Sequence, residues 1–207
     1  MTHSRHDAQT TCTADEALAR LKAGNARFLA GHARFPTVQK EILANLAKGQ
    51  RPFATLLGCS DSRVPPELVF DASFGELFVV RVAGNVLGPS IAGTLQYAGV
   101  YLHTPLLVVL GHEDCGAVEA AIAERFHGIK HRSRIEILLR EIIPALEAVD
   151  PALPPEALLE ACVEANVRTT LARILASPEW KENAAPRGMK AVGAIYQLST
   201  GEVRFLE

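Results

Sequence analysis

The sequence predicts an α/β fold in which helices cover both faces of a mostly parallel sheet. Two observations support this prediction. Short apolar runs bounded by glycine, proline or charge alternate along the chain with longer helical stretches. The chain then closes with an apolar run, a Ser-Thr-Gly turn and a second short run, which is typical of a strand that turns back on its neighbour. The 207 residues fit one domain, 1–207.

Two helices are expected before the sheet, as an N-terminal arm over residues 1–50. Thr13-Ala-Asp-Glu16 has the form of a capping box, which opens a helix. This helix carries apolar residues along one side, namely Leu18, Leu21 and Phe28. Pro36 can begin a second helix that ends at Gly49. An arm with such an apolar stripe can pack on a partner subunit.

The core, residues 51–207, follows the arm. Apolar runs predict strands at Phe53–Gly58, Leu77–Val82, Leu106–Leu110, Lys190–Leu198 and Val203–Leu206. Helices are expected at Ser90–Leu102 (with Ser90 as the N-cap), Ala117–Phe126, Arg132–Ala148 and Pro155–Ala176. In parallel α/β sheets, ligands bind at the carboxyl ends of the strands. The functional site is therefore expected where the runs ending at Gly58 and Leu110 meet.

Composition argues against several classes of protein. Hydrophobic residues make up 48% of the chain, charged residues 21%, and the formal net charge is -2. No basic stripe is present, so nucleic acid is not an expected partner. The apolar runs are too short to span a membrane, and the polar residues 1–11 lack the apolar segment of a secretory signal. The expected location is the cytoplasm, where a disulfide framework is not expected for the four cysteines.

Two of these cysteines lie where a ligand site is expected. Cys59 directly follows the first predicted strand, and His112-x-x-Cys115 follows the third. Zinc prefers thiolate and imidazole ligands, and a catalytic zinc keeps three protein ligands and one open position. The pattern predicts a catalytic zinc site that activates water. The alternative is that these are unrelated thiols and a loop histidine; Cys12 and Cys162 are interpreted as ordinary thiols of that kind.

Asp61 and Arg63 lie beside the first of these cysteines. At two-residue spacing in an extended loop their side chains point the same way, so they can pair. A carboxylate held in this way can accept a hydrogen bond from zinc-bound water or replace that water as a fourth ligand. The alternative is an ion pair that only braces the loop.

Together these motifs resemble the β-class carbonic anhydrases. The similarity rests on Cys59-Ser-Asp-Ser-Arg63, His112-Glu-Asp-Cys115 and the segment Gly75-Glu-Leu-Phe-Val-Val-Arg-Val-Ala-Gly-Asn85. It implies zinc ligands Cys59, His112 and Cys115, with Asp61 and Arg63 as a catalytic dyad. It also implies four parallel strands with a fifth, antiparallel edge strand, and a homodimer that can pair further into a tetramer.

The resemblance also implies an activity and a second set of site residues. The reaction is the reversible hydration of carbon dioxide to bicarbonate and a proton, by attack of zinc-bound hydroxide. Residues that complete the pocket across a dimer interface match Gln50, which would donate to the substrate oxygen, Phe78 and Tyr97. Ala83 matches a minor wall position.

Two other functions stay open on the sequence alone. Some relatives with this fold hydrolyse carbon disulfide or carbonyl sulfide, and the motifs do not separate them from carbonic anhydrases. A zinc-binding or bicarbonate-sensing protein without turnover is the other alternative. The dyad argues against it, as does Leu56, since relatives with a regulatory bicarbonate site carry Trp at that position.

Overall fold

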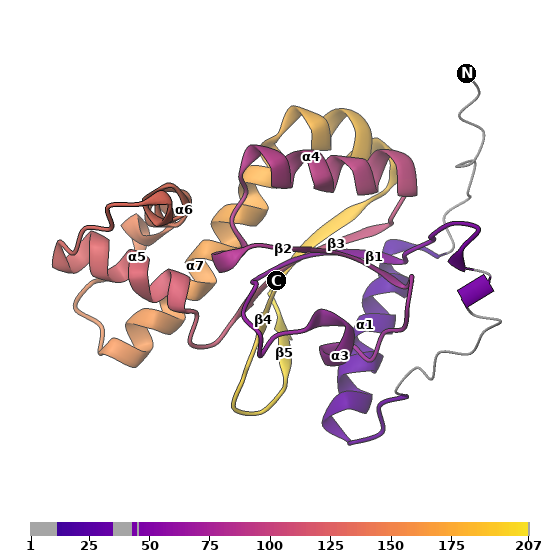
Figure 1. Ribbon diagram of the computed structural model, residues 1–207, viewed down its shortest axis with the longest axis horizontal. Helices are drawn as coiled ribbons and strands as arrows, with labels where there is room; N and C mark the ends of the chain where they lie inside the picture. The colour runs from indigo at the N-terminus through magenta and orange to yellow at the C-terminus, as the bar shows by residue number, and fades with distance from the viewer. Residues whose placement is uncertain (1–11, 35–42, 45, 207) are drawn as a thin grey trace.

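The computed structural model describes residues 12–34, 43–44 and 46–206 and contains a five-stranded sheet (Figure 1). The strands lie in the order β2-β1-β3-β4-β5. Their bounds are β1 Ala54–Gly58, β2 Leu77–Arg81, β3 Leu106–His112, β4 Lys190–Tyr196 and β5 Val203–Phe205. The first four are parallel and β5 runs antiparallel to β4, which confirms the predicted sheet.

Six described helices and several shorter turns surround this sheet. The α-helices are α1 Ala14–Leu29, α3 Pro66–Val69, α4 Pro89–Tyr97, α5 Gly116–His127, α6 Arg134–Ile142 and α7 Pro155–Ala176. The shorter turns are η1 Ala83–Asn85, η2 Ala98–Leu102, η3 Ile143–Ala148, η4 Trp180–Ala184 and η5 Ala185–Arg187. None of the helices in the described part of the chain is both long and apolar enough to cross a membrane.

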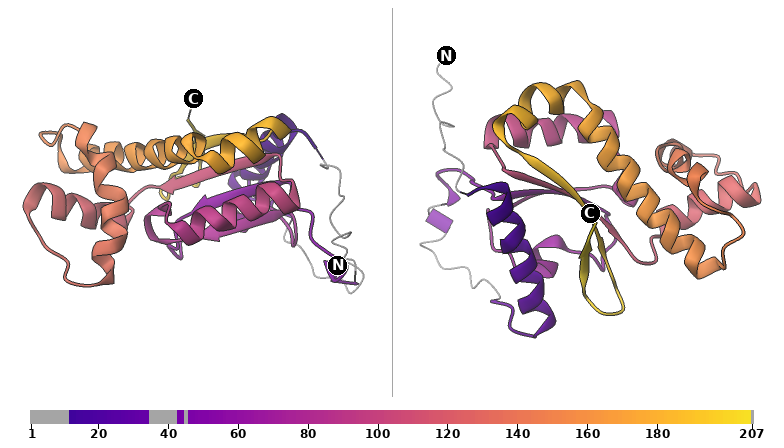
Figure 2. Two further views of the ribbon diagram at one scale, coloured as in Figure 1. Left: turned by 90° about the horizontal axis from the view of Figure 1, so that it is seen from above. Right: turned by 180° about the vertical axis from the view of Figure 1, so that it is seen from behind.

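Both faces of the sheet are covered, because successive side chains of a strand point in opposite directions. Figures 1 and 2 show α4 and α7 on one side and α1 and α3 on the other. Leu57, Leu107 and Val109 belong to the core beneath α4 and α7. Leu56, Leu106 and Val108 belong to the core beneath α1 and α3. The continuous apolar runs in the sequence therefore reflect strands that are buried on both faces.

Several predicted boundaries differ from the structure by one or two residues, and three differences have a visible local cause. β3 continues through His112, because this residue pairs with Tyr196 of β4. The helix expected at Ser90 begins at Pro89, with Gly88 as the N-cap; proline is favoured in the first turn because its missing N–H would have no helical partner there. The helix expected over residues 132–148 divides into α6 and the 3₁₀ turn η3, whose second residue is Pro144.

The first helix of the predicted arm packs on its own subunit. Both halves of its capping box form, with Glu16 N–H donating to Thr13 Oγ1 and Thr13 N–H donating to the Glu16 carboxylate. Leu21 is fully buried against the sheet, and Leu18 and Phe28 pack beside it. Most of the stripe is therefore used within the subunit, and its predicted contact with a partner stays a prediction. The second predicted helix, 36–49, falls largely on residues 35–42 and 45, which lie outside the described residues.

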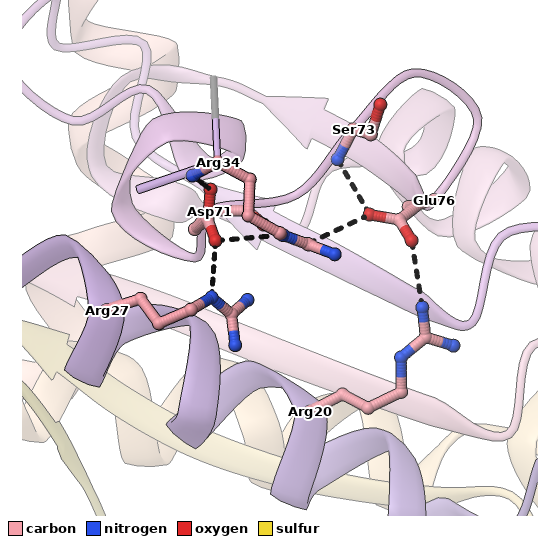
Figure 3. Close-up of polar contacts among 6 residues, drawn as sticks. All are labelled: Arg20, Arg27, Arg34, Asp71, Ser73 and Glu76. Carbon is pink, nitrogen blue, oxygen red and sulfur yellow. Dashed lines mark hydrogen bonds and ion pairs between the residues drawn. The ribbon is translucent and has the colours of Figure 1, made fainter. Parts of the chain in front are cut away.

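A buried carboxylate ties α1 to the loop before β2 (Figure 3). Asp71 accepts hydrogen bonds from Arg27 Nε at 2.6 Å and from Arg34 N and Nε at 2.7 and 3.0 Å. Glu76 accepts from Arg20 Nη2 at 2.9 Å and from Ser73 N–H at 2.7 Å. These contacts hold α1 and the residues after it against the segment that leads into β2.

Candidate metal centre

Three side chains from separate elements meet at the carboxyl end of the sheet. Cys59 follows β1, His112 ends β3, and Cys115 is the N-cap of α5. Because β1 and β3 are adjacent and parallel, with Gly58 paired to Leu110, their carboxyl ends lie together. Asp114 adopts a positive φ of 52°, and this turn brings Cys115 back toward the strand ends. The ligand atoms of all three side chains lie within 4.8 Å of one another.

The chemistry of this cluster fits a metal ion. All three residues are buried, at 5%, 0% and 1% exposure for Cys59, His112 and Cys115. His112 Nδ1 lies 2.7 Å from the Glu113 carbonyl, so this nitrogen carries the proton and Nε2 is the free acceptor. Nε2 is buried and has no hydrogen-bond partner among the described residues. Two thiols and an orphaned imidazole nitrogen form a ligand set that can hold zinc.

The pKa shifts of Cys59 and Cys115 also fit a site that binds a cation. Hydrogen bonding from Cys115 lowers the pKa of Cys59. The same contact, together with burial, raises the pKa of Cys115 well above its ordinary value. Burial opposes a charge on His112, but the neighbouring thiolate outweighs it and raises the pKa of the imidazole. A bound dication would stabilise the ionised form of both thiols.

Asp61 and Arg63 form the expected pair beside this cluster. Arg63 donates from Nε to Asp61 Oδ1 at 3.0 Å and from Nη2 to Oδ2 at 2.8 Å, and its backbone N–H also donates to Oδ1. These hydrogen bonds hold the pKa of the Asp61 carboxyl well below its ordinary range. Asp61 Oδ2 lies 3.9 Å from His112 Nε2. The carboxylate is thus charged, oriented, and adjacent to the ligand atoms.

Two further residues, which the sequence did not single out, organise the site. Arg81, the last residue of β2, donates to the carbonyls of Cys59 at 3.0 Å and Asp61 at 2.6 Å. Gly84, in η1, donates its N–H to Cys59 Sγ at 3.4 Å. Both lie in the Gly75–Asn85 segment. An arginine at a strand's carboxyl end, on the rim where ligands bind, is the signal that could have identified Arg81.

The structure separates the predicted substrate residues into two groups. Ala83 lies in η1, directly before Gly84 and so beside Cys59. Gln50 is exposed and precedes the amino end of β1, whereas Cys59 follows its carboxyl end. β1 has 5 residues. At about 3.3 Å per residue it spans roughly 17 Å, and Gln50 and Cys59 lie beyond its opposite ends. Phe78 is paired with Thr55 near the same amino end. It stacks on Tyr97, with ring centroids 6.2 Å apart.

Comparisons with known proteins agree on one family. The family model described as carbonic anhydrase matches residues 54–203. Carbonic anhydrase 2 of Mycobacterium tuberculosis is 37% identical over 183 residues, which cover 87% of each protein. The carbonic anhydrase of Mycolicibacterium smegmatis is 36% identical over 191 residues, 88% of each.

A solved structure extends this agreement to the fold. The β-carbonic anhydrase CafA of Aspergillus fumigatus superimposes with a TM-score of 0.74 at 28% identity, covering 93% of this chain and 90% of that one. The matched segment contains the whole metal-ligand cluster and the Asp61–Arg63 pair. The parallel sheet, its antiparallel edge strand and the Cys-His-Cys cluster at its rim all fit the same conclusion: this chain belongs to the β-class carbonic anhydrases.

Proposed function

We propose that this protein catalyses the reversible hydration of carbon dioxide to bicarbonate and a proton, with one zinc ion held by Cys59, His112 and Cys115. The observation that carries the proposal is the buried ligand cluster beside the Asp61–Arg63 pair, in a chain of the carbonic anhydrase family. Zinc supplies hydroxide near neutral pH by lowering the pKa of a water molecule.

The protein residues bind the ion and direct the attack. The Glu113 carbonyl fixes the orientation of the His112 ring, so that Nε2 is the ligand atom. Asp61 Oδ2 accepts a hydrogen bond from the attacking oxygen and orients its lone pair toward the substrate carbon. Arg63 keeps that carboxylate ionised and in place. The carbonyl of Asp114 accepts from Arg63 Nη2 at 3.2 Å, which links the pair to the second ligand loop.

We infer that a second subunit completes the pocket, so that the working unit is a homodimer, with a dimer of dimers as a further step. Gln50 lies before the amino end of β1, too far from its own cluster to reach it, and would act in the partner's site by donating to the substrate oxygen. An aromatic surface beside β2 supports this arrangement. Tyr97 and Tyr101 are 41% and 49% exposed, and Tyr97 packs against Phe78 and Tyr101. Phe78 and Tyr97 would line the pocket of the partner subunit. Ala83 would line the pocket of the subunit to which it belongs.

Stopped-flow measurement of carbon dioxide hydration, on protein of known zinc content, tests the activity. Zinc-loaded protein should hydrate carbon dioxide, chelation should abolish the activity, and added zinc should restore it. Cys59→Ser should lose zinc and activity together. Cys162→Ser is the matched control, because Cys162 is fully buried but outside the cluster, and it should keep both.

The same assay separates the alternatives. Carbonyl sulfide run in parallel should be hydrolysed far more slowly than carbon dioxide is hydrated. Faster turnover of carbonyl sulfide would make the protein a hydrolase of sulfur analogues. Zinc-loaded protein without turnover of either substrate would make it a zinc-binding or bicarbonate-binding protein instead.

A further inference from the structure

Asn166 lies behind the metal centre and contacts it only through another residue. It is in the middle of α7 and is 1% exposed. Its Nδ2 donates to the Gly84 carbonyl at 2.8 Å. Gly84 in turn donates its N–H to Cys59 Sγ at 3.4 Å. A side chain on α7 is thus linked, through one glycine, to a thiolate of the cluster.

Gly84 needs this support because its own backbone does little to hold it. Its φ of 69° lies in the left-handed region, which glycine adopts without strain and with little restraint. A Cβ at this position would lie 2.7 Å from Ile142 Cδ1, so no larger residue can take its place without movement. The peptide that follows Gly84 is held at both ends. Asn166 binds its carbonyl, and the Asn85 N–H donates to Val82 O at 3.0 Å.

The hydrogen bond to Cys59 Sγ bears on the chemistry of a bound ion. An N–H donor draws electron density from a thiolate, so the sulfur gives less charge to its metal and the metal remains more electrophilic. Cys115 is placed differently, since it is the N-cap residue of α5 and its side chain makes no capping hydrogen bond. Cys59 has no helix start of its own, and η1 supplies its donor.

We propose that Asn166 is a positioning residue for the metal centre: it holds Gly84 so that the Gly84 N–H donates to Cys59 Sγ and limits the charge that this thiolate gives to zinc. The inference rests on the proposed zinc site. It predicts that loss of the Asn166 donor changes the metal–sulfur bond although Asn166 touches neither the ion nor the substrate.

The hydrogen bond can be detected directly in the wild-type protein loaded with ¹¹³Cd²⁺. A scalar coupling between the Gly84 amide proton and the cadmium nucleus is expected, transmitted through Cys59 Sγ. Asn166→Leu, of similar size but without a donor, should lose this coupling. It should keep the couplings between the cadmium nucleus and the Hβ protons of Cys115, which pass through covalent bonds and serve as an internal control. Absence of the Gly84 coupling in the wild-type protein would overturn the proposal, whether or not any variant folds.

The Co²⁺-loaded protein gives a second readout. In Asn166→Leu the thiolate-to-cobalt charge-transfer band should move to lower energy, because the sulfur is more electron-rich. Zinc release to a chelator should become about tenfold faster, because without the N–H donor the Cys59 side chain is held less firmly in its ligating position. Thr170→Val is the matched control: Thr170 is 3% exposed and one turn further along α7, and its variant should show neither change. An unchanged band and an unchanged release rate in Asn166→Leu would reduce Asn166 to a packing role.

Two points keep the test decisive. Should Asn166→Leu fail to fold, Asn166→Ala removes the same donor without adding bulk in this buried position, so it should show the same band shift. The spectra also need no carbon dioxide. If the wild-type protein does not hydrate carbon dioxide but shows the expected couplings to cadmium, the proposed reaction is contradicted and the Asn166 inference stands. A missing Gly84 coupling in an enzyme that hydrates carbon dioxide would overturn the inference alone.

Discussion

The Asp61 carboxylate lies beside the metal ligands and is held by Arg63, so its loss should separate catalysis from metal binding. Asp61→Asn is expected to retain one zinc ion per subunit and to lose kcat/KM by about 100-fold or more, because an amide lacks the charge that orients the attacking oxygen. Zinc analysis and stopped-flow hydration measure the two effects. Asp15→Asn removes an exposed acid paired with Lys190 and should change neither. Near-wild-type turnover in Asp61→Asn would remove Asp61 from the mechanism.

The ligand charges predict how activity depends on pH. Two thiolates cancel the formal charge of zinc, which makes it a weaker Lewis acid than zinc held by three neutral imidazoles. Turnover should therefore rise between about pH 7 and about pH 9. The Asp61–Arg63 pair does not cause this rise. Arg63 lowers the pKa of Asp61, and Asp61 raises the pKa of Arg63, so both pKa values move away from this pH range. Initial hydration rates in buffers of constant ionic strength check the profile, and a flat profile would contradict it.

At the scale of elements, Asp71 determines how firmly α1 and the residues after it are attached (Figure 3). Its side chain is 3% exposed and accepts charge-assisted hydrogen bonds from Arg27 and Arg34. Asp71→Asn should lower the free energy of unfolding by about 2 kcal/mol, the usual range for hydrogen bonds to a charged group. Urea denaturation at one protein concentration measures this loss. Glu76→Gln, which alters a more exposed carboxylate of the same cluster, should cost less than about 1 kcal/mol.

The effect of Asp71 should also depend on pH. Burial raises the pKa of this carboxyl, but the hydrogen bonds from Arg27 and Arg34 outweigh it, so the folded-state pKa lies below the unfolded one. Its stabilising contribution is therefore fully present above the unfolded pKa, about 3.9. The contribution disappears as pH falls through the folded value. The stability difference between wild type and Asp71→Asn should be constant near pH 7 and shrink below about pH 4. A difference that grows in acid would contradict this account.

The strands and the clustering of Cys59, His112 and Cys115 were predictable from the sequence because both depend on local patterns. Continuous apolar runs marked strands buried on both faces, and Cys59 and His112 stood at the strand ends. The supports of the site were not predictable. Gly84 and Asn166 are 82 residues apart and meet only once α7 covers the sheet. The use of the α1 stripe within its own subunit was likewise hidden, because an amphipathic pattern does not tell which surface covers it.

At the scale of the whole molecule, the position of Gln50 allows a test of the proposal that each site is shared between subunits. Cys59, one of the proposed zinc ligands, follows the carboxyl end of β1, and Gln50 lies before its amino end. In a symmetric dimer the same surface of each subunit faces the other, so one subunit can supply Gln50 to its partner's zinc and receive the partner's in return. Gln50→Ala should then reduce activity by about tenfold or more through loss of a hydrogen bond to the substrate oxygen, without loss of zinc.

A hybrid dimer decides whether Gln50 acts across the interface. Gln50→Ala lacks the donor and should keep about a tenth of the activity or less. Cys59→Ser lacks the metal and should be nearly inactive. Co-expression with two different affinity tags, followed by purification on both, isolates the hybrid. One of its two sites then has zinc from the first subunit and Gln50 from the second, and the hybrid should recover about half of the wild-type rate. If Gln50 served its own subunit, neither site would be complete and the hybrid would stay inactive. A hybrid of Cys59→Ser with His112→Ala, in which both zinc sites are broken, gives the background.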